Sequence, residues 1–456
     1  MAYQSTNPYT GEVVKTFDEI DDQQLETRLT AAQDCFEQVW RHKSFAERKA
    51  VLSRAAAIMR ERSQQFAELI TLEMGKLIAQ SQGEVTLSAS ILEYYAEHAE
   101  SFLAPEKLGT RNGDAVVESS PIGVLFGVEP WNYPYYQIAR FAAPNLMAGN
   151  VVMVKHASNV PQCALAFERL LQEAGAPAGA YTNLFISKDQ VAHVIDDDRI
   201  RAVALTGSEA AGAVVARRAG KNLKKSTLEL GGSDAFIVLD DADLDKAVKH
   251  AVSGRMGNSG QACTASKRFI VVETLADRFL EKFQAAMQAF APGDPMDPKT
   301  SLAPLSSAQA LQTLLGQVDE AVAHGARVLL GGKRIEGQAG AFMQPTILTD
   351  IDDGNPAYAQ EFFGPVALFF RVPDEAAAVA LANDSPFGLG GSVFTQDVER
   401  GKRVARQIDT GMVFINSAAV STPDLPFGGV KNSGYGRELS SAGIQEFVNK
   451  KLIRVN

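Results

Sequence analysis

Residues 200–212 read IRAVALTGSEAAG, a short apolar run that passes through a turn of small residues into a helical pattern. Two further apolar runs, at residues 122–128 and 151–154, are likewise separated by helical stretches. One of these stretches begins near Pro161 and ends before Gly175, the usual order of these residue types at helix ends. Strands that alternate with helices form the crossover units of a parallel sheet. The sequence therefore predicts an α/β fold.

A second section of the same alternating kind begins near residue 234 and runs to about residue 415, while residues 45–100 have helical periodicity. At 456 residues the chain is long enough for two or three domains. The joint between the alternating sections falls close to Glu229, so we expect Glu229 and Cys263 to face a crevice between domains. Ligands usually bind in such crevices.

The turn at residues 206–212 is a candidate phosphate site. Main-chain N–H groups at the start of the following helix can hold a pyrophosphate. The glycine spacing differs from the G-x-G-x-x-G of the common dinucleotide fingerprint, so a plain strand-to-helix turn explains this stretch equally well on its own.

Cys263 ends the run GNSGQAC, and Glu229 lies earlier in the run LELGG. A thiol among small and polar residues, with no second cysteine nearby, suits a nucleophile that is reached through a narrow passage. A carboxylate beside glycines suits a base whose backbone passes close to a ligand. The alternative for Cys263 is a packed apolar residue, which is the role we predict for Cys35 and Cys163.

Composition excludes several classes of function. The net charge of −10, with no basic stripe, argues against a nucleic-acid partner. Three distant cysteines and an N-terminus without a signal pattern predict a cytoplasmic location, and no apolar run has the length of a membrane span. Six scattered histidines make a catalytic metal unexpected. The acidic runs at residues 196–198 and 240–243 lack the pattern of a calcium loop, and the second is better explained as charge at a helix N-terminus.

Seven motifs occur in one order along the chain. They are PWNYP (130–134), VK (154–155), TGS (206–208), ELGG (229–232), GQAC (260–263), EFFGP (361–365) and PFGG (426–429). This series resembles that of the aldehyde dehydrogenase superfamily over nearly the whole chain. Within the superfamily the chain most resembles the short bacterial succinate-semialdehyde dehydrogenases, through YQIAR (136–140), KHAS (155–158) and SGYGREL (433–439).

The resemblance implies an aldehyde dehydrogenase-like α/β fold with a Rossmann-type cofactor domain, an α/β catalytic domain and a small β oligomerisation element. We expect the NAD(P)-binding domain at residues 1–100 and 119–229 and the catalytic domain at residues 230–430. The oligomerisation element is expected at residues 101–118 and 431–456, and it implies a homodimer or homotetramer.

The resemblance also implies catalytic roles. The Cys263 thiolate attacks the aldehyde to give a thiohemiacetal, and the Asn132 side-chain amide with the Cys263 N–H holds the oxyanion. Glu229 activates the water that hydrolyses the later thioester, and it can also take the thiol proton. From the residues alone, Asn132 is equally a turn residue.

Lys155 and Glu361 are expected to bracket the two riboses of the cofactor, and Trp131 and Phe363 to line its channel. The full set of expected cofactor contacts is Trp131, Asn132, Lys155, His156, Ala157, Ser158, Gly207, Ser208, Leu230, Gly231, Glu361 and Phe363.

Ser158 carries the prediction of the coenzyme. Many NAD-preferring relatives have a glutamate at this position, whose charge would repel a 2′-phosphate. Ser158 removes that repulsion and Lys155 supplies a countercharge, so NADP is expected to be preferred, with NAD usable. The alternative is that Ser158 caps the helix beginning near Pro161.

Arg140 follows Asn132 by a little over two helical turns, so both can face one side of a helix. We expect its guanidinium to bind a distal carboxylate of the substrate, with Ser421, from the loop at residues 416–423, as a second donor and Tyr136 as an apolar wall. Without the resemblance, Arg140 is better explained as an ordinary charge on a helix surface.

The sequence thus predicts the oxidation of succinate semialdehyde to succinate with NADP or NAD. The alternative within the same class is a non-acylating dehydrogenase of another small aldehyde. A coenzyme-A-acylating enzyme is disfavoured because Glu229 is present. A non-catalytic descendant of the fold is disfavoured because Cys263, Glu229, Asn132 and Lys155 are all present.

Overall fold

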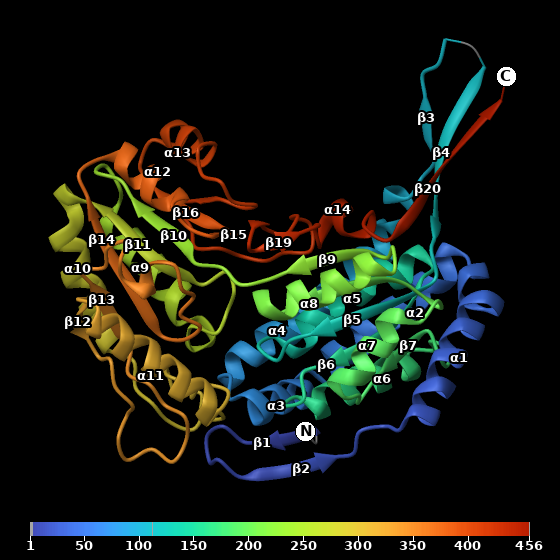
Figure 1. Cartoon of the computed structure of the whole chain (residues 1–456), viewed down its shortest axis with the longest axis horizontal. Coiled ribbons are helices and arrows are strands. Elements are labelled where there is room, and N and C mark those ends of the chain that lie inside the picture. The colour runs from blue at the N-terminus through green and yellow to red at the C-terminus, as the bar shows by residue number, and fades with distance from the viewer. Residues whose placement is uncertain (1–2, 112, 456) are drawn as a thin grey trace.

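The computed structural model describes residues 3–111 and 113–455. Two lobes, each built on a mainly parallel sheet, lie side by side, and a narrow arm of three strands projects from one of them (Figure 1). The chain crosses between the lobes directly after β9 (Lys225–Glu229) and enters the second sheet at β10 (Asp234–Val238). The predicted α/β fold is confirmed.

The first lobe contains a six-stranded sheet with the order β19-β9-β8-β5-β6-β7. Every neighbouring pair is parallel except β19 and β9, which are antiparallel. Its strands are β5 (Val124–Glu129), β6 (Val151–His156), β7 (Tyr181–Asn183), β8 (Ile200–Thr206), β9 and β19 (Gly434–Tyr435). The apolar runs of the sequence form β5, β6 and β8, three of the four interior strands, because a parallel strand is buried on both faces.

Helices connect the strands of this sheet and cover it. The crossover helices are α5 (Pro134–Ala148), α6 (Pro161–Glu173), α7 (Lys188–Asp196) and α8 (Glu209–Lys221). The N-terminal helices are α1 (Asp22–Gln38), α2 (Phe45–Glu61), α3 (Ser63–Met74) and α4 (Ile78–Phe102), with the short helix η1 (Trp40–His42). Local capping fixes where they begin: Ser44 accepts from the Glu47 N–H at 3.3 Å and the Glu47 side chain accepts from the Ser44 N–H at 2.8 Å.

The second lobe contains a seven-stranded sheet with the order β12-β13-β14-β11-β10-β16-β17. Its strands besides β10 are β11 (Ser266–Val272), β12 (Arg327–Leu330), β13 (Thr346–Thr349), β14 (Val366–Val372), β16 (Gly391–Phe394) and β17 (Phe414–Ile415). Its helices are α9 (Leu244–Met256), η2 (Gly257–Gly260), α10 (Glu273–Gln288), α11 (Ala308–Ala323), η3 (Pro356–Tyr358), α12 (Glu375–Asn383) and α13 (Val398–Ala405). Separate apolar clusters fill the two faces of the sheet.

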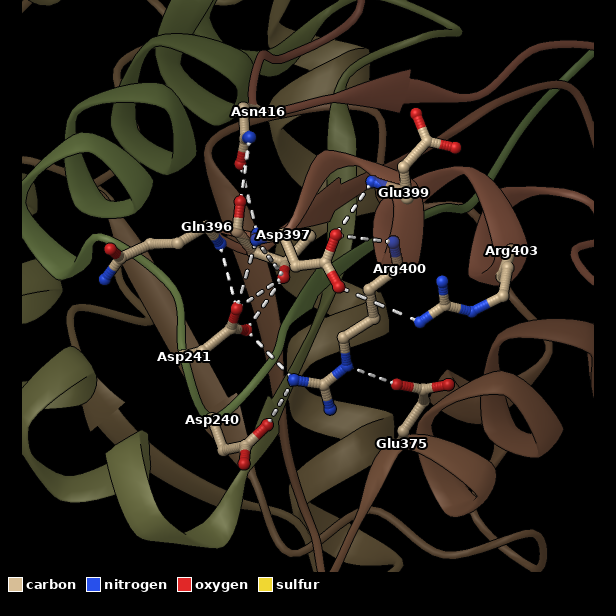
Figure 2. Close-up of polar contacts among 10 residues, drawn as sticks. Asp240, Asp241, Glu375, Gln396, Asp397, Glu399, Arg400, Arg403 and Asn416 are labelled. Carbon is tan, nitrogen blue, oxygen red and sulfur yellow. Dashed lines mark hydrogen bonds and ion pairs between the residues drawn. The ribbon is translucent and has the colours of Figure 1, made fainter.

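Salt bridges and hydrogen bonds connect the carboxyl ends of the strands in this second sheet (Figure 2). Arg400 on α13 pairs with Asp240 and Asp241, which follow β10, and with Glu375 at the start of α12. Asp241 also accepts from the Thr395 hydroxyl at 2.8 Å. These contacts connect segments that follow β10, β14 and β16.

Helix α9 explains part of the acidic run at residues 240–243. Asp243 is the N-cap of α9 and accepts from the Lys246 N–H at 3.1 Å. The predicted placement of acidic charge at a helix N-terminus is confirmed for this residue.

The arm consists of β3 (Glu106–Leu108), β4 (Asp114–Pro121) and β20 (Val448–Val455), in the order β20-β4-β3. Of the segment 431–456, predicted as part of the oligomerisation element, β20 joins this arm, whereas β19 pairs with β9 and α14 (Ser440–Ile444) packs against α4 and α5. Asn456 lies outside the described residues.

Two small antiparallel pairs complete the fold. They are β1 (Tyr3–Thr6) with β2 (Val13–Phe17), and β15 (Phe387–Gly388) with β18 (Val430–Lys431). In the part of the chain that the structure describes, no helix combines the length and the apolar character needed to cross a membrane.

Candidate active site

A cavity of about 280 Å³ lies between the two sheets. From the first sheet it is lined by residues that follow strands, and from the second by residues that precede strands. The lining residues are Pro130, Trp131, Asn132, Gln137, Thr206, Gly207, Ser208, Glu229, Leu230, Gly231, Cys263, Glu361 and Phe363. The structure therefore brings together the three predicted catalytic residues, Cys263, Glu229 and Asn132.

A strained turn presents Cys263 to this cavity. Asn258, Ser259 and Gly260 have φ angles of 52°, 51° and 77°, which lie in the left-handed region. A Cβ at Gly260 would collide with the carbonyl of Gly364. The glycine is therefore required here both for its φ angle and for the close approach of two backbones.

Lys267, the second residue of β11, fixes the segment that carries Cys263. Its ammonium donates to the carbonyl of Ala262 at 2.9 Å and to that of Cys263 at 2.7 Å. It also forms an ion pair of 3.0 Å with Glu361, and its own side chain is fully buried. Lys267 thus connects the nucleophile segment to a predicted cofactor ligand.

Burial raises the pKa of the Cys263 thiol to about 12. The nearby cations Arg140 and Lys267 lower the pKa of this thiol, and the carboxylates of Glu361 and Glu229 add to the increase. At neutral pH the thiol is therefore protonated, and a base must take its proton before it can attack a carbonyl carbon.

Glu229, the last residue of β9, has the properties of such a base. Neither of its carboxylate oxygens has a hydrogen-bond partner among the described residues. Burial, and next the charge of Glu438, raise the pKa of Glu229 well above its ordinary value, while Arg140 and Arg437 lower it. Unshared lone pairs and a raised pKa suit a general base for a thiol or a water molecule.

Asn132 lies in the turn between β5 and α5, with its side chain directed at the Cys263 segment. Its Nδ2 donates to the carbonyl of Gln261 at 3.1 Å. A primary amide carries two N–H groups, so one remains to stabilise negative charge in the cavity. Asn132 is 4% exposed, and a donor in so dry a place acts strongly on a developing oxyanion.

Glu361 and Gly231 form a surface that suits a ribose. Glu361 accepts from the Gly232 N–H at 3.1 Å, and a Cβ at Gly231 would approach the other carboxylate oxygen of Glu361 to 2.5 Å. The aromatic rings of Trp131 and Phe363 meet edge to face at 5.8 Å. These residues therefore fit the nicotinamide end of a dinucleotide.

The phosphates are expected at the turn after β8, where Ser208 is the N-cap of α8 and accepts from the Ala211 N–H at 3.4 Å. The first-turn N–H groups of a helix favour anions. Gly207 and Ser208 both line the cavity, as their prediction as cofactor ligands requires.

The KHAS segment, predicted as a cofactor site, lies beyond the 280 Å³ cavity. Lys155 is half-buried, and burial lowers the pKa of its ammonium. Ser158 lines a second cavity of about 640 Å³. Helix α6 has Val160 as its N-cap without a side-chain cap hydrogen bond, so the alternative role of Ser158 as a cap is wrong.

His156 is directed into the fold. Its Nε2 lies 2.9 Å from the Pro134 carbonyl, and its Nδ1 lies 2.9 Å from the Ala157 N and 3.1 Å from the Glu129 carbonyl. Burial lowers the pKa of His156 to about 4, and the ring stays neutral. Any contact of His156 with a cofactor therefore comes from its main chain.

Arg140 is 1% exposed, so its interpretation as a charge on the helix surface is wrong. Its Nε forms an ion pair with Glu438. Its Nη1 donates to the Tyr136 hydroxyl and its Nη2 to the Thr206 hydroxyl, both at 3.2 Å. Arg140 thus has internal partners, one of which, Thr206, lines the cavity.

Tyr136 connects the other two residues that were predicted to bind the substrate, Arg140 and Ser421. Burial raises the pKa of its hydroxyl, while Arg140 and a side-chain hydrogen bond with Ser421 lower it. Tyr136 therefore contributes a polar group at this position in addition to the predicted apolar wall.

Several residues of this site were not among the predicted ones. Gln137 and Thr206 line the cavity directly beside predicted residues, one residue after Tyr136 and one residue before Gly207. Those neighbour relations were the available signal. Glu438 lies in the SGYGREL motif and Lys267 lies four residues after Cys263, but their ion pairs with Arg140 and Glu361 join segments far apart in the sequence.

Comparison with known proteins now identifies the family. The model of the aldehyde dehydrogenase family matches residues 1–453. The chain belongs to the aldehyde dehydrogenase family.

Three of the similar proteins are named for succinate semialdehyde. A succinate-semialdehyde dehydrogenase [NADP(+)] of Deinococcus radiodurans is 53% identical over 99% of this chain and 94% of that protein. A probable succinate-semialdehyde dehydrogenase [NADP(+)] of Synechocystis is 47% identical over 99% of both chains. The crystal structure of a succinic semialdehyde dehydrogenase from Streptococcus pyogenes, in complex with NADP+, is 50% identical, covers 100% of both chains and has a TM-score of 0.98.

Proposed function

We propose that this aldehyde dehydrogenase oxidises succinate semialdehyde to succinate with NADP as its preferred coenzyme. The observation that carries the proposal is the convergence of Cys263, Asn132 and Glu229 on one cavity, which Glu361 and Gly231 also line. The names of the similar proteins support both the substrate and the coenzyme.

The chain's own residues perform the acyl chemistry. Glu229 takes the thiol proton, and the Cys263 sulfur attacks the aldehyde carbon to form a thiohemiacetal. The second N–H of the Asn132 amide, together with the Cys263 N–H, stabilises the oxyanion that forms. The bound nicotinamide supplies the hydride acceptor that converts this adduct to a thioester.

Hydrolysis of the thioester needs the same base. Glu229 removes a proton from a water molecule, which attacks the thioester carbon and releases the acid and the free thiol. The thiol proton and the water proton pass through one carboxylate at different stages. The unshared oxygens of Glu229 suit both stages, because no internal donor holds them.

The preference for NADP is proposed from Ser158 and Lys155. A serine in place of a carboxylate removes the repulsion of a 2′-phosphate, and the Lys155 ammonium offers an opposite charge. Ser158 lines the 640 Å³ cavity, so this position has room for a phosphate beside it.

The proposed anchor of the substrate carboxylate is the group formed by Arg140, Tyr136 and Ser421. The charge of Arg140 lowers the pKa of the Cys263 thiol, and Arg140 donates to the hydroxyl of Thr206, which lines the same cavity as Cys263. The ion pair with Glu438 uses the Nε edge of the guanidinium, and the Nη atoms lie toward Tyr136 and the cavity-lining Thr206.

We further propose that the protein forms a homodimer or homotetramer through its arm. The strand β20 lies at an edge of its sheet, with Leu452 60% and Val455 64% exposed. Edge strands with exposed apolar residues are ready to pair with another chain, and the partner proposed here is a second copy. The three cysteines are free thiols, which supports a cytoplasmic location.

Steady-state kinetics on a panel of aldehydes tests the proposal. The panel contains aldehydes of matched length with and without a terminal carboxylate, each measured with NADP and with NAD. We expect the highest kcat/KM for succinate semialdehyde with NADP. A higher value for an uncharged aldehyde would favour a dehydrogenase of another small aldehyde, and a strong preference for NAD would contradict the role of Ser158.

A further inference from the structure

A fully buried ion pair lies behind the candidate active site. Lys76 follows α3, in the short connection to α4, and Glu84 lies on α4. Their side chains are both 0% exposed, and neither lines the cavity. A buried ion pair is weak evidence for stability, because apolar residues of similar volume often stabilise a protein equally well. The pair therefore needs another explanation.

The contacts of Lys76 lead to Asn132. The ammonium donates to the main-chain carbonyl of Asn132 at 2.9 Å, and it lies 3.6 Å from the centre of the Tyr133 ring. Asn258 donates to the same carbonyl at 3.0 Å. Both lone pairs of this carbonyl are thus occupied, and the peptide plane after Asn132 is held from two directions.

The contacts of Glu84 fix the next part of the same turn. Its Oε1 accepts from the N–H of Tyr135 at 2.9 Å and from that of Tyr136 at 3.3 Å. These N–H groups belong to the first turn of α5, whose N-cap residue, Tyr133, makes no side-chain cap hydrogen bond. Glu84 supplies this cap from another helix, and its charge is stabilised by the positive end of the helix dipole.

We propose that Lys76 and Glu84 are positioning residues that hold Asn132 in the orientation needed to stabilise the oxyanion. The pair fixes the backbone on both sides of Tyr133, and so it determines where the Asn132 amide points. Hydrogen-bond donors stabilise a transition state only when they are oriented in advance, and supporting residues supply that orientation. The inference rests on the proposed function, because it assigns Asn132 to the oxyanion.

A double-mutant cycle tests whether Lys76 acts through Asn132. The variants are Lys76→Met, Asn132→Ala and both together, and the measurement is the single-turnover rate of NADPH formation at saturating aldehyde. Lys76→Met should slow this step about 10- to 100-fold, part of the loss expected for an oxyanion donor. In the Asn132→Ala background the same substitution should change the rate less than about two-fold. If the rate reductions of Lys76→Met and Asn132→Ala multiply in the double variant, the two residues act independently and the proposal is overturned.

Two further measurements separate positioning from general damage. Alkylation of Cys263 by iodoacetamide needs no oxyanion, so its rate and the affinity for NADP should stay within about two-fold of the wild type in Lys76→Met. If the alkylation rate and the affinity for NADP both fell by the same factor as the single-turnover rate, the proposal would be overturned. Arg60→Met is the control, because it breaks an exposed ion pair between α2 and α4 without contact to Asn132, and it should keep the wild-type rate.

The double variant Lys76→Met/Glu84→Gln removes both charges at once. If the pair only compensates charge, this variant recovers the wild-type rate and the proposal is wrong. Positioning predicts that the rate stays low, because the Asn132 carbonyl has lost a donor. Where Lys76→Met folds poorly, Glu84→Gln takes its place in the cycle. The wild-type rate on the aldehyde panel decides the proposed function separately, since every comparison here is a ratio of variants on whichever aldehyde the wild type oxidises.

Discussion

The two sheets face the same crevice with opposite ends of their strands. In the six-stranded sheet, the site residues follow the strands, as Asn132 follows β5 and Ser208 follows β8. In the seven-stranded sheet they precede them, as Cys263 precedes β11 and Phe363 precedes β14. The usual rule places ligands at the carboxyl ends of parallel strands, and it holds for one sheet only.

The difference separates two tasks. Carboxyl ends lead into helix N-termini, whose N–H groups favour phosphates, and the six-stranded sheet offers these to a dinucleotide. The amino end of each strand follows a loop. The loop before β11 contains three successive residues in the left-handed region, and this loop presents Cys263 to the cavity. At the remaining carboxyl edge, in the second sheet, Arg400 connects the segments that follow β10 and β14 (Figure 2).

The largest effect is expected at the amino ends of the strands in the second sheet. Replacing Cys263 with Ala removes the only group there that forms a covalent bond with substrate, so turnover should fall about 10⁴-fold or more. Binding of NADP, followed by fluorescence titration, should stay nearly unchanged. Substantial steady-state activity in this variant would contradict the covalent mechanism.

The second prediction concerns Glu229, at a carboxyl end of the first sheet. Glu229→Gln keeps the shape of the side chain but removes the base, so deacylation should slow about 10²- to 10⁴-fold. Stopped-flow absorbance should record a burst of NADPH that is slower than in the wild type, because Glu229 also takes the thiol proton before acylation, followed by a steady state limited by deacylation. A variant that loses the burst and retains rapid turnover of preformed acyl-enzyme would reverse the assigned roles.

Arg140 should have a smaller effect that depends on the substrate. Loss of a charge-assisted hydrogen bond costs about 2–4 kcal/mol of transition-state binding. Arg140→Ala should therefore lower kcat/KM for succinate semialdehyde about 30- to 700-fold more than for an uncharged aldehyde of similar length. Arg140→Ala also breaks the ion pair with Glu438, and this loss affects both aldehydes, so the uncharged aldehyde is the control. Equal losses for both aldehydes would make Arg140 structural.

The pH dependence of deacylation should change in a defined direction. Deacylation needs the Glu229 carboxylate, and burial and the charge of Glu438 raise the pKa of Glu229. The rate should therefore rise with pH through a transition above the ordinary range of a carboxyl group. Glu438→Gln removes a like charge and frees Arg140, both of which lower this pKa, so the acid limb should move to lower pH. A shift toward higher pH would contradict the electrostatic assignment.

The smallest effect is expected at the carboxyl edge that does not face the crevice. Arg400→Met should lower the free energy of unfolding by about 1 kcal/mol, because its ion pairs are partly exposed. Its kcat/KM should stay within about three-fold of the wild type. A large catalytic loss with little change in thermal stability would show that this edge also serves the site.

Sequence patterns predicted what is local. The buried strands β5, β6 and β8 and the residues directly after them follow from apolar runs and motifs, and the fold and family that the motifs indicated are confirmed. The predicted substrate and coenzyme agree with the names of the similar proteins. The individual roles of the site residues and the domain limits stay predictions.

The sequence did not indicate the internal partners of the predicted site residues, because these partners come from distant segments of the chain. Arg140 was expected to be free for a substrate, but its ion pair with Glu438 joins α5 to the C-terminal part of the chain. The prediction of His156 as a cofactor ligand came from its motif, while its burial against the Pro134 carbonyl depends on how β6 packs beside β5. Such partners arise only after the sheet has assembled.

The strand pairs at the end of the chain have a consequence for folding. Gly434 pairs with Glu229, and Val448–Val455 pairs with Asp114–Pro121, so both ladders join early segments to the last ones made. During synthesis, one edge of β9 and one edge of β4 stay unpaired until the ribosome has made nearly the whole polypeptide. Contacts of such long sequence separation fold slowly and expose unpaired edges to aggregation. Loss of only the final residues would therefore leave the newly made chain at the stage where it is most prone to associate wrongly.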